Sequence, residues 1–395
     1  MLVRKAVINN VSDAVCIIKN TGCDPRAVDL FVKKSAIIPI IIEGIDNRAA
    51  NILKQDAISC GADATVSENV SRFQKGVSNA VLFASHKQAE NLINKLCLQP
   101  FGLKEVALQL DIILKKSIAG KKYLRYKNSK IDLSKTAVMG IINLDPNSFS
   151  GDGLTDAGAA VEQALRFESE GAKILDIGAE SSRPGSKPVD AKTEIKRLIP
   201  ALKKIRKATK LPISIDTYKY ETAKIALDEG ADIINDIFAL RRGKDKLAKL
   251  IASQKAGVIL THMKGEPQNM QRNPRYKNCV SEVYEFLKER KNYAQSFGIN
   301  EDFISVDPGP GFGKNTNHNL ELLKNMSVFS TLGAVIGAVS RKHFIRETAG
   351  ENLSSYVCAN VLAAIYGADI IRTHDVKETT DALKMYNWMR GCIDA

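Results

Sequence analysis

Short apolar runs alternate with amphipathic segments from residue 136 onward. Near-continuous apolar runs are typical of parallel strands that are buried on both faces. The predicted strands are Ala137–Asn143, Lys173–Gly178, Pro212–Asp216, Ile233–Asp236, Val258–His262, Ile304–Asp307, Val335–Gly337 and Ile370–His374. Helical patterns lie between most neighbouring strands, for example over Ala157–Glu170, Thr222–Glu229 and Ser281–Phe297, and a glycine follows each of these three.

Eight strand–helix units in about 255 residues have the number and size expected of a TIM (β/α)8 barrel. A doubly wound open sheet is the alternative, but eight units of similar length favour closure. The sequence therefore predicts an α/β barrel over residues 136–395. In such a barrel the carboxyl ends of the strands form the active face.

The chain before the barrel is predicted to be a small α/β domain over residues 1–116. Its predicted strands are Lys5–Ile8, Ile37–Ile42 and Ala80–Ala84, and its predicted helices are Arg48–Cys60, Lys87–Leu96 and Leu103–Leu114. It contains no phosphate loop, catalytic triad spacing or metal signature. Residues 117–135 are basic and predict a β-hairpin, with Lys122–Tyr126 and Lys130–Leu133 on either side of a turn at Lys127–Ser129.

The charge of the chain is uneven, with a net value of +13 and 20 Lys/Arg against 11 Asp/Glu in residues 1–130. This basic part lacks interleaved aromatic residues, so a solvated face is favoured over a nucleic-acid site. No apolar run is long enough for a membrane span or a signal peptide, and a cytoplasmic protein is expected. The seven scattered cysteines predict reduced, buried thiols without a disulfide framework or a zinc site.

Every predicted barrel strand leads into polar residues, which should converge on one mouth. They are Asn143, Asp176, Asp216, Asn235 with Asp236, His262, Asp307, Ser340 to Lys342, and Arg372 with His374 and Asp375. A single aspartate at a strand end is as easily a helix cap or turn former. Eight polar ends at one mouth instead indicate a ligand site.

The chemistry of these side chains points to a phosphorylated heterocycle. Carboxylates such as Asp216 accept paired hydrogen bonds from a flat ring that carries N–H and NH2 groups. Lys342, Arg372 and His374 come from the last two strands, where barrels often bind phosphate. Asn143 offers an oxygen ligand for Mg2+, and Phe312 an aromatic wall. Group transfer from such a heterocycle is the reaction that this set suggests.

Eight segments, in order and spacing, resemble the signature segments of dihydropteroate synthases. They are MGIINLDPNSFSGDG, DIGAESSRPG, SIDT, IINDI, THMKGEPQNMQ, DPGPGFGK, SRK and RTHDV. The resemblance covers about residues 120–390. It implies a transferase of folate biosynthesis that condenses 6-hydroxymethyl-7,8-dihydropterin pyrophosphate with p-aminobenzoate to 7,8-dihydropteroate and pyrophosphate. It also implies a homodimer, inhibition by sulfonamides, and no nucleic-acid or membrane partner.

The resemblance also implies a role for each matching residue. Asp216, Asn235 and Asp307 should bind the pterin ring, with Lys342 beside it. Asn143, Arg372 and His374 should hold the pyrophosphate, Asn143 through Mg2+. Ser182, Arg183 and Phe312 should close over p-aminobenzoate. Among these residues, Asp307, Lys342, Arg372 and His374 are expected to act directly in catalysis.

The first loop departs from the family pattern, which usually resembles TPDSFSDGG. Here Asp145 stands at the usual threonine and Asn147 at the usual aspartate, and Gly151–Asp152 reverses the usual order. An acidic residue is moved rather than lost, so Mg2+ coordination or loop closure could differ from the family. Ser182 replaces the usual threonine and keeps its hydroxyl.

Two other functions are compatible with part of this pattern. A methyl-transferring pterin-binding barrel would share the pterin contacts but would not need the cations of SRK and RTHDV. A non-catalytic pterin-binding protein would explain the altered first loop and the extra domain. The presence of Asn143, Lys342, Arg372 and His374 argues against it. The sequence does not assign a role to the N-terminal domain.

Overall fold

The computed structural model divides the chain into two units. One comprises Met1–Ala119 with Trp388–Ala395, and the other comprises Gly120–Asn387. The residues that the structure describes are 1–4, 6–8, 10–118, 123–144, 156–181, 184–243 and 245–391. Within them, no helix is both long and apolar enough to cross a bilayer.

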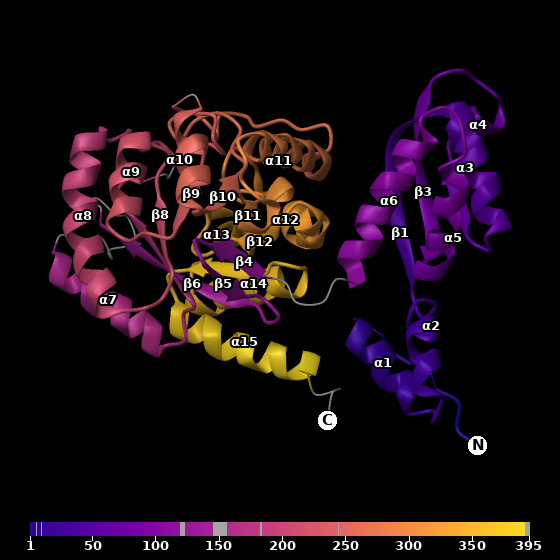
Figure 1. Cartoon of the computed structure of the whole chain (residues 1–395), viewed down its shortest axis with the longest axis horizontal. Helices are drawn as coiled ribbons and strands as arrows, with labels where there is room; N and C mark the ends of the chain where they lie inside the picture. Colours follow the sequence, from indigo (N-terminus) through magenta and orange to yellow (C-terminus); the bar gives the residue numbers. More distant parts are fainter. Residues whose placement is uncertain are drawn as a thin grey trace. The chain divides into compact units, whose positions relative to one another are not determined.

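The N-terminal unit contains a three-stranded antiparallel sheet in the order β1-β3-β2. Its elements are α1 (Val11–Lys19), η1 (Pro25–Ala27), α2 (Val28–Val32), β1 (Ile37–Asp46), α3 (Asn47–Ser59), β2 (Asp63–Val66), α4 (Glu68–Ser71), β3 (Val77–Ser85), α5 (His86–Leu96) and α6 (Leu103–Ile118). Figure 1 shows α3, α5 and α6 beside this sheet. Their apolar faces and the inward residues of the strands, such as Leu53, Leu82, Leu92 and Leu110, form one core.

The predicted strands near residues 37 and 80 and the three predicted helices of this unit are confirmed. The predicted strand Lys5–Ile8 is wrong: residues 6–8 join no strand. Val7 is 65% exposed, and a short apolar run forms a strand only when a neighbouring strand satisfies its backbone groups. The sequence patterns did not predict four short elements of this unit, which are α1, α2, β2 and α4.

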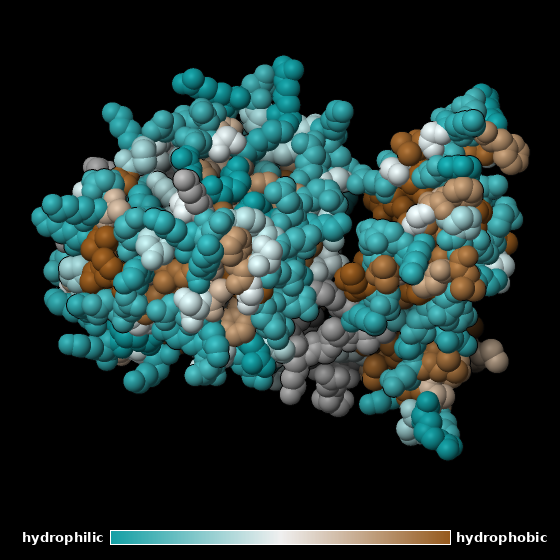
Figure 2. Space-filling model, turned by 45° about the horizontal axis from the view of Figure 1, so that its top comes forward, coloured by the Kyte–Doolittle hydropathy of each residue, from teal (hydrophilic) through white to brown (hydrophobic). Residues whose placement is uncertain are grey.

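The outer face of the N-terminal sheet is apolar and open to solvent. Ile37 and Ile41 on β1 are 66% and 70% exposed, and Phe83 on β3 is 39% exposed. Figure 2 shows apolar surface gathered over this unit. These residues point away from the helices because successive side chains of a strand alternate between its two faces.

The second unit is a closed barrel of eight parallel strands. They are β6 (Ala137–Asn143), β7 (Ile174–Gly178), β8 (Ile213–Asp216), β9 (Ile233–Asp236), β10 (Gly257–Thr261), β11 (Ile304–Asp307), β12 (Ala334–Gly337) and β13 (Ile370–Thr373). The pairing of β13 with β6, in which Ile370 lies opposite Ala137, closes the sheet. This contact confirms the predicted barrel and excludes the open doubly wound sheet.

Helices surround these strands in sequence order (Figure 1). They are α7 (Ala157–Ser169), α8 (Ala191–Ala208), α9 (Tyr220–Asp228), α10 (Lys246–Gln254), α11 (Cys279–Ser296), η2 (Glu301–Phe303), α12 (Thr316–Lys324), η3 (Met326–Thr331), α13 (His343–Ala349), α14 (Leu353–Ile365) and α15 (Val376–Gly391). The largest apolar core lies between the helices and the outward faces of the strands.

The predicted β-hairpin is confirmed as β4 (Tyr123–Tyr126) and β5 (Ser129–Asp132). Leu124, Ile131 and Leu133 pack with the first residues of the barrel strands, such as Ile174 and Ile370. This packing fills the interior at the amino ends of the strands. A ligand can therefore enter the barrel only from the carboxyl ends.

The cysteines are only partly as predicted. Among the described residues none forms a disulfide, but the prediction of buried thiols is wrong for five of the six described cysteines. Cys97 and Cys358 are exposed, Cys16, Cys23 and Cys60 are intermediate, and Cys279 alone of these six is buried. Cys97 follows the last turn of α5 and Cys358 lies on the outer side of α14, so neither faces a core.

Candidate active site

A cavity of about 1480 Å3 lies at the carboxyl ends of the barrel strands. Six of the predicted site residues line it: Asn143, Asp216, Phe312, Lys342, Arg372 and His374. Ser182 and Arg183 lie outside the described residues, but Ser181 and Pro184 on either side of them line the cavity. The altered positions Asp145, Asn147 and Asp152 of the first loop also lie outside the described residues.

Arg372 joins carboxylates from two different strands at the base of this cavity. Its Nε donates to Asp176 Oδ2 at 2.6 Å, and its Nη2 donates to Asp216 Oδ2 at 2.9 Å. Asp176 is fully buried, and its second oxygen, Oδ1, has no hydrogen-bond partner among the residues that the structure describes. The sequence predicted Arg372 only as an anion ligand and missed this pairing, because Asp176 and Arg372 are 196 residues apart.

Burial changes the ionisation of these acids. It raises the pKa of Asp216 to about 7, with Arg372 opposing this rise and Asp176 adding to it. Burial also raises the pKa of Asp307, while its hydrogen bond from Gly309 opposes the rise. Two carboxylates share one guanidinium here. Their oxygens let this end of the barrel accept hydrogen bonds from a ligand that carries N–H groups.

Asn235 and Asp307 lie beside this group. The Asn235 amide donates to Asp176 Oδ2 at 3.3 Å. Asp307 Oδ1 accepts the Gly309 N–H at 2.7 Å, which fixes the start of the DPGPGFGK loop. Gly309 has φ +67°, and a Cβ at this position would lie 1.9 Å from the carbonyl oxygen of His262. The loop therefore requires glycine where it passes over the β10 end.

An apolar cluster reaches the cavity through Phe312, which lines it. The other members of this cluster, here called the apolar wall, lie behind Phe312 and do not line the cavity; they are Ile237, Phe238, Met263 and Met270. The ammonium group of Lys342 lies 4.3 Å from the centre of the Phe312 ring, in a cation–π contact. Met263 of the THMKGEPQNMQ segment belongs to this wall and is 1% exposed. A flat aromatic ligand in the cavity would meet an apolar surface beside a positive charge.

The last two strands bring His374 and Ser340 together. Ser340 Oγ lies 3.3 Å from His374 Nδ1 and accepts the His374 backbone N–H at 3.3 Å. Next to them Arg341, with φ +54°, pairs with Asp375 at 2.7 Å. A residue other than glycine at positive φ is uncommon and costs conformational energy. The pair with Asp375 holds Arg341 in this conformation.

A buried lysine, which the sequence analysis did not single out, supports the glycine-rich loop. Lys314 Nζ donates to the carbonyl oxygens of Gly309 and Phe312, both at 2.9 Å, and lies 2.8 Å from His262 Nδ1. Burial lowers the pKa of Lys314 to about 7, and burial together with the Lys314 charge lowers that of His262. His262, which the sequence left with a mixed role, therefore helps to position the Phe312 loop.

Asp236 is a structural residue rather than a ligand residue. Its two carboxylate oxygens accept the backbone N–H groups of Phe238 at 2.7 Å and Leu240 at 2.8 Å. Burial raises its pKa to about 6, while these two bonds oppose the rise. The carboxylate thus shapes the turn after β9. Asp176 orients side chains instead, because its Oδ2 accepts hydrogen bonds from Arg372 and Asn235.

Comparisons with known proteins agree on one family. Residues 139–374 match the pterin binding enzyme family. The structure of Xanthomonas albilineans dihydropteroate synthase with 4-aminobenzoic acid is 38% identical and has a TM-score of 0.63; the match covers 68% of this chain and 98% of that chain. The chain belongs to the dihydropteroate synthase family.

Two further relatives of this family match beyond the barrel. The "Bifunctional dihydropteroate synthase/dihydropteroate reductase" of Helicobacter pylori is 32% identical over 93% of this chain and 94% of its own length. The "Probable bifunctional folylpolyglutamate synthase/dihydropteroate synthase" of Haloferax volcanii is 34% identical over 86% of this chain, which spans only 42% of that relative. The chain is therefore an enzyme that transfers a pterin group to p-aminobenzoate and forms 7,8-dihydropteroate in folate biosynthesis.

Proposed function

We propose that the cavity at the carboxyl ends of the barrel strands is the site of this condensation. Asp216, Asn235 and Asp307 form hydrogen bonds with the pterin ring, and Arg372 holds Asp176 and Asp216 in place through its two hydrogen bonds. The observation that carries the proposal is the pairing of Arg372 with two strand-end carboxylates in a cavity that Lys342 and His374 also line. Acceptors for the ring and cations for the phosphates thus surround one space.

The proposed reaction replaces a C–O bond with a C–N bond and releases one proton. The bond between the pterin methylene carbon and the pyrophosphate oxygen breaks, and its electron pair leaves with the pyrophosphate. The amine nitrogen of p-aminobenzoate forms a bond to the same carbon and then releases a proton to solvent. Lys342, Arg372 and His374 stabilise the negative charge that develops on the leaving group. An activating base is not needed because the arylamine attacks a strongly electrophilic carbon.

The described residues fit a Mg2+ ion that is held mainly by the substrate. They contain no group of three or more His, Cys, Asp or Glu side chains that could bind a metal, whereas Asn143 offers one amide oxygen at the cavity wall. Mg2+ commonly keeps several waters and binds one or two protein oxygens together with substrate phosphates. We infer that Asn143 supplies such an oxygen. When bound, the ion would neutralise charge on the leaving pyrophosphate.

The wall around Phe312 supports a place for p-aminobenzoate. Its ring would lie on Phe312, which lines the cavity. Ser182 and Arg183 stay predicted ligands of the same substrate. A sulfonamide has a similar size and shape, so we expect it to compete with p-aminobenzoate. The resemblance also supports a homodimer and a cytoplasmic location; light scattering of the purified chain would test the first.

The extended match to the Helicobacter pylori protein favours a second activity for testing. That relative is named for both synthesis and reduction of dihydropteroate, and its match includes most of the N-terminal unit. Reduction of the product would add a hydride from a reduced nicotinamide or flavin, together with a proton, to a ring C=N bond. The test is incubation with 7,8-dihydropteroate and such a donor. Formation of tetrahydropteroate would support the activity, and its absence would exclude it.

The main proposal is tested with the purified full chain. We expect 7,8-dihydropteroate and pyrophosphate in equal amounts from the dihydropterin pyrophosphate, p-aminobenzoate and Mg2+. Chelation of Mg2+ should lower the rate, and excess Mg2+ should restore it. Binding of the pterin without product would instead support the non-catalytic alternative. Transfer of a methyl group from a methylated pterin would support the methyltransferase alternative.

A further inference from the structure

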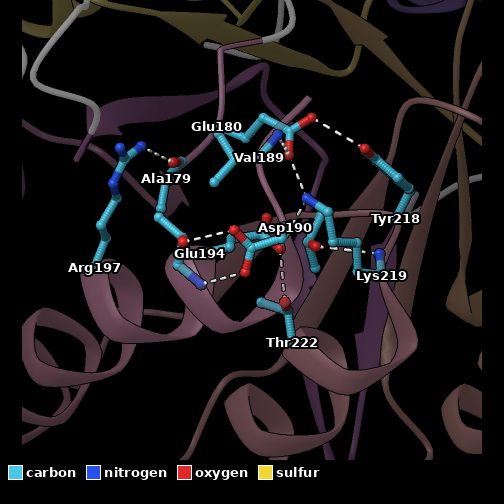
Figure 3. Close-up of polar contacts among 11 residues, drawn as sticks. Ala179, Glu180, Val189, Asp190, Glu194, Arg197, Tyr218, Lys219 and Thr222 are labelled. Atoms are coloured by element: carbon cyan, nitrogen blue, oxygen red, sulfur yellow. Dashed lines mark hydrogen bonds and ion pairs between the residues drawn. The ribbon is translucent and has the colours of Figure 1, made fainter. Parts of the chain in front are cut away.

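A network of buried charges lies at the base of the connection between β7 and α8. Glu180 follows β7, Glu194 lies in the first turn of α8, and Lys219 precedes α9. Figure 3 shows the three side chains pointing toward one another. Lys219 Nζ donates to Oε2 of Glu180 and, at 3.1 Å, to Oε2 of Glu194. One ammonium group therefore joins both ends of this connection.

The groups of this network are poorly solvated. Glu194 is 1% exposed and also accepts the Thr222 hydroxyl at 2.6 Å. Burial raises the pKa of Glu194, while Lys219 opposes the rise. Burial also disfavours the charged form of Lys219, but the two carboxylates outweigh this effect and raise its pKa. Removal of Lys219 would leave two poorly solvated carboxylates without their common partner.

Glu180 links the two ends of the connection between β7 and α8. Its Oε2 accepts the Val189 N–H at 3.2 Å, which brings the two ends of segment 181–188 together. Arg197 of α8 donates to the carbonyl oxygen of Ala179 at 3.2 Å. The Gly185 N–H donates to the carbonyl oxygen of Pro267 at 2.8 Å. Ser181 and Pro184 of the closed segment line the active-site cavity.

Tyr218 connects the same network to the apolar wall that contains Phe312. Its hydroxyl donates to Glu180 Oε1 at 3.1 Å (Figure 3). The centres of its ring and of the Phe238 ring lie 4.8 Å apart in an edge-on arrangement. Tyr218 also packs against the apolar wall that contains Phe312. Two surfaces that face the proposed p-aminobenzoate site are thus tied to Glu180.

We propose that Lys219, with Glu180 and Glu194, is a positioning residue that holds the wall formed by Ser181 and Pro184 in place for the aromatic amine substrate. The proposal rests on the proposed function of the cavity. Glu180 also lines the cavity, but Tyr218, Lys219 and Val189 occupy its oxygens. It therefore acts through the protein rather than as a base for the incoming amine.

The test compares Lys219→Met with Lys219→Arg in the full chain. Lys219→Met should raise KM for p-aminobenzoate about tenfold. This is the increase expected when the wall adopts its binding conformation only about one tenth of the time. The kcat at saturation and the Kd for the dihydropterin pyrophosphate should stay within about twofold when measured well above pH 7. Glu180 and Glu194 act on Asp216 by raising its pKa, and at such a pH the Asp216 carboxylate is ionised in both proteins. Lys219→Arg keeps the charge and should restore most of the affinity. A merely structural role would lower the melting temperature without this selective rise in KM.

A matched control and a milder variant complete the design. Lys224→Met removes a 3.3 Å pair with Asp228 on the exposed side of α9 and should change neither KM. Glu180→Gln keeps the side-chain shape and should raise KM for p-aminobenzoate about threefold. It replaces Lys219→Met in the test if that variant does not fold. An unchanged KM for p-aminobenzoate in the folded variants would overturn the proposal. An inactive wild-type chain would instead contradict the proposed function itself.

Discussion

The two units of the chain arrange their strands differently, and the difference explains where chemistry collects. The barrel strands are parallel, so Asp216 on β8, Asp307 on β11 and Arg372 on β13 all lie at one rim. The N-terminal strands are antiparallel, so their ends alternate between two edges and bring no such set together. The N-terminal unit instead exposes apolar residues such as Ile41 on its sheet. Parallel topology therefore concentrates polar strand ends into a site.

The sharpest test of this comparison is Arg372→Ala. It should abolish measurable synthase activity and lower the free energy of unfolding by about 3–5 kcal/mol, because Asp176 and Asp216 lose their common partner. Denaturant unfolding and product formation measure the two effects. Arg166→Ala, which breaks a 3.8 Å surface pair with Glu170, is the control and should change neither. A stable, active Arg372→Ala protein would show that the carboxylate pairing is not central.

Lys342→Ala separates chemistry from stability. The side chain lines the cavity and contacts the face of Phe312, so its loss should leave the melting temperature nearly unchanged. We expect kcat/KM to fall about 10²–10³-fold, as for the loss of one group that stabilises developing charge. Lys377→Ala, in an exposed pair with Asp381, should have full activity. Full activity of Lys342→Ala would remove this residue from the site.

Pterin binding should weaken as the pH falls below about 7. Asp216 accepts ring N–H groups only when it is ionised, and burial raises its pKa to about 7. At pH 8 the carboxylate is ionised; below pH 7 a proton must leave before the ring can bind. 6-Hydroxymethylpterin is the ligand for this test because it lacks the phosphates, which titrate in this pH range. Its Kd should rise about tenfold per pH unit below 7. Calorimetry that shows a constant Kd from pH 5 to 8 would exclude this role for Asp216.

The smallest effect is expected in the N-terminal unit. Ile41→Ser replaces an apolar side chain that is 70% exposed on the open face of β1. Synthase kcat and both KM values should stay within about twofold, since surface substitutions away from a site are usually near neutral. Steady-state kinetics of the full chain give the answer. A large loss of synthase activity would place part of the condensation machinery outside the barrel.

The sequence predicted most of the barrel and part of its site. Apolar runs located all eight strands, and the polar residues after them located Asp216, Lys342 and Arg372 in one cavity. Pattern analysis could not find the partners that distant segments supply, such as Asp176 for Arg372 or Lys219 for both Glu180 and Glu194. It also missed Lys314, because a lysine in a glycine-rich loop suggests solvent exposure, whereas here three acceptors compensate its burial. The predicted strand before α1 does not form because no neighbouring strand pairs with that segment.

The most direct measurement is a crystal structure of the full chain with a non-hydrolysable analogue of the dihydropterin pyrophosphate. The account predicts the ring within hydrogen-bond distance of Asp216 and Asp307, with the phosphates directed toward Asn143 and His374. A ring bound away from these aspartates, or phosphates outside the cavity, would contradict it.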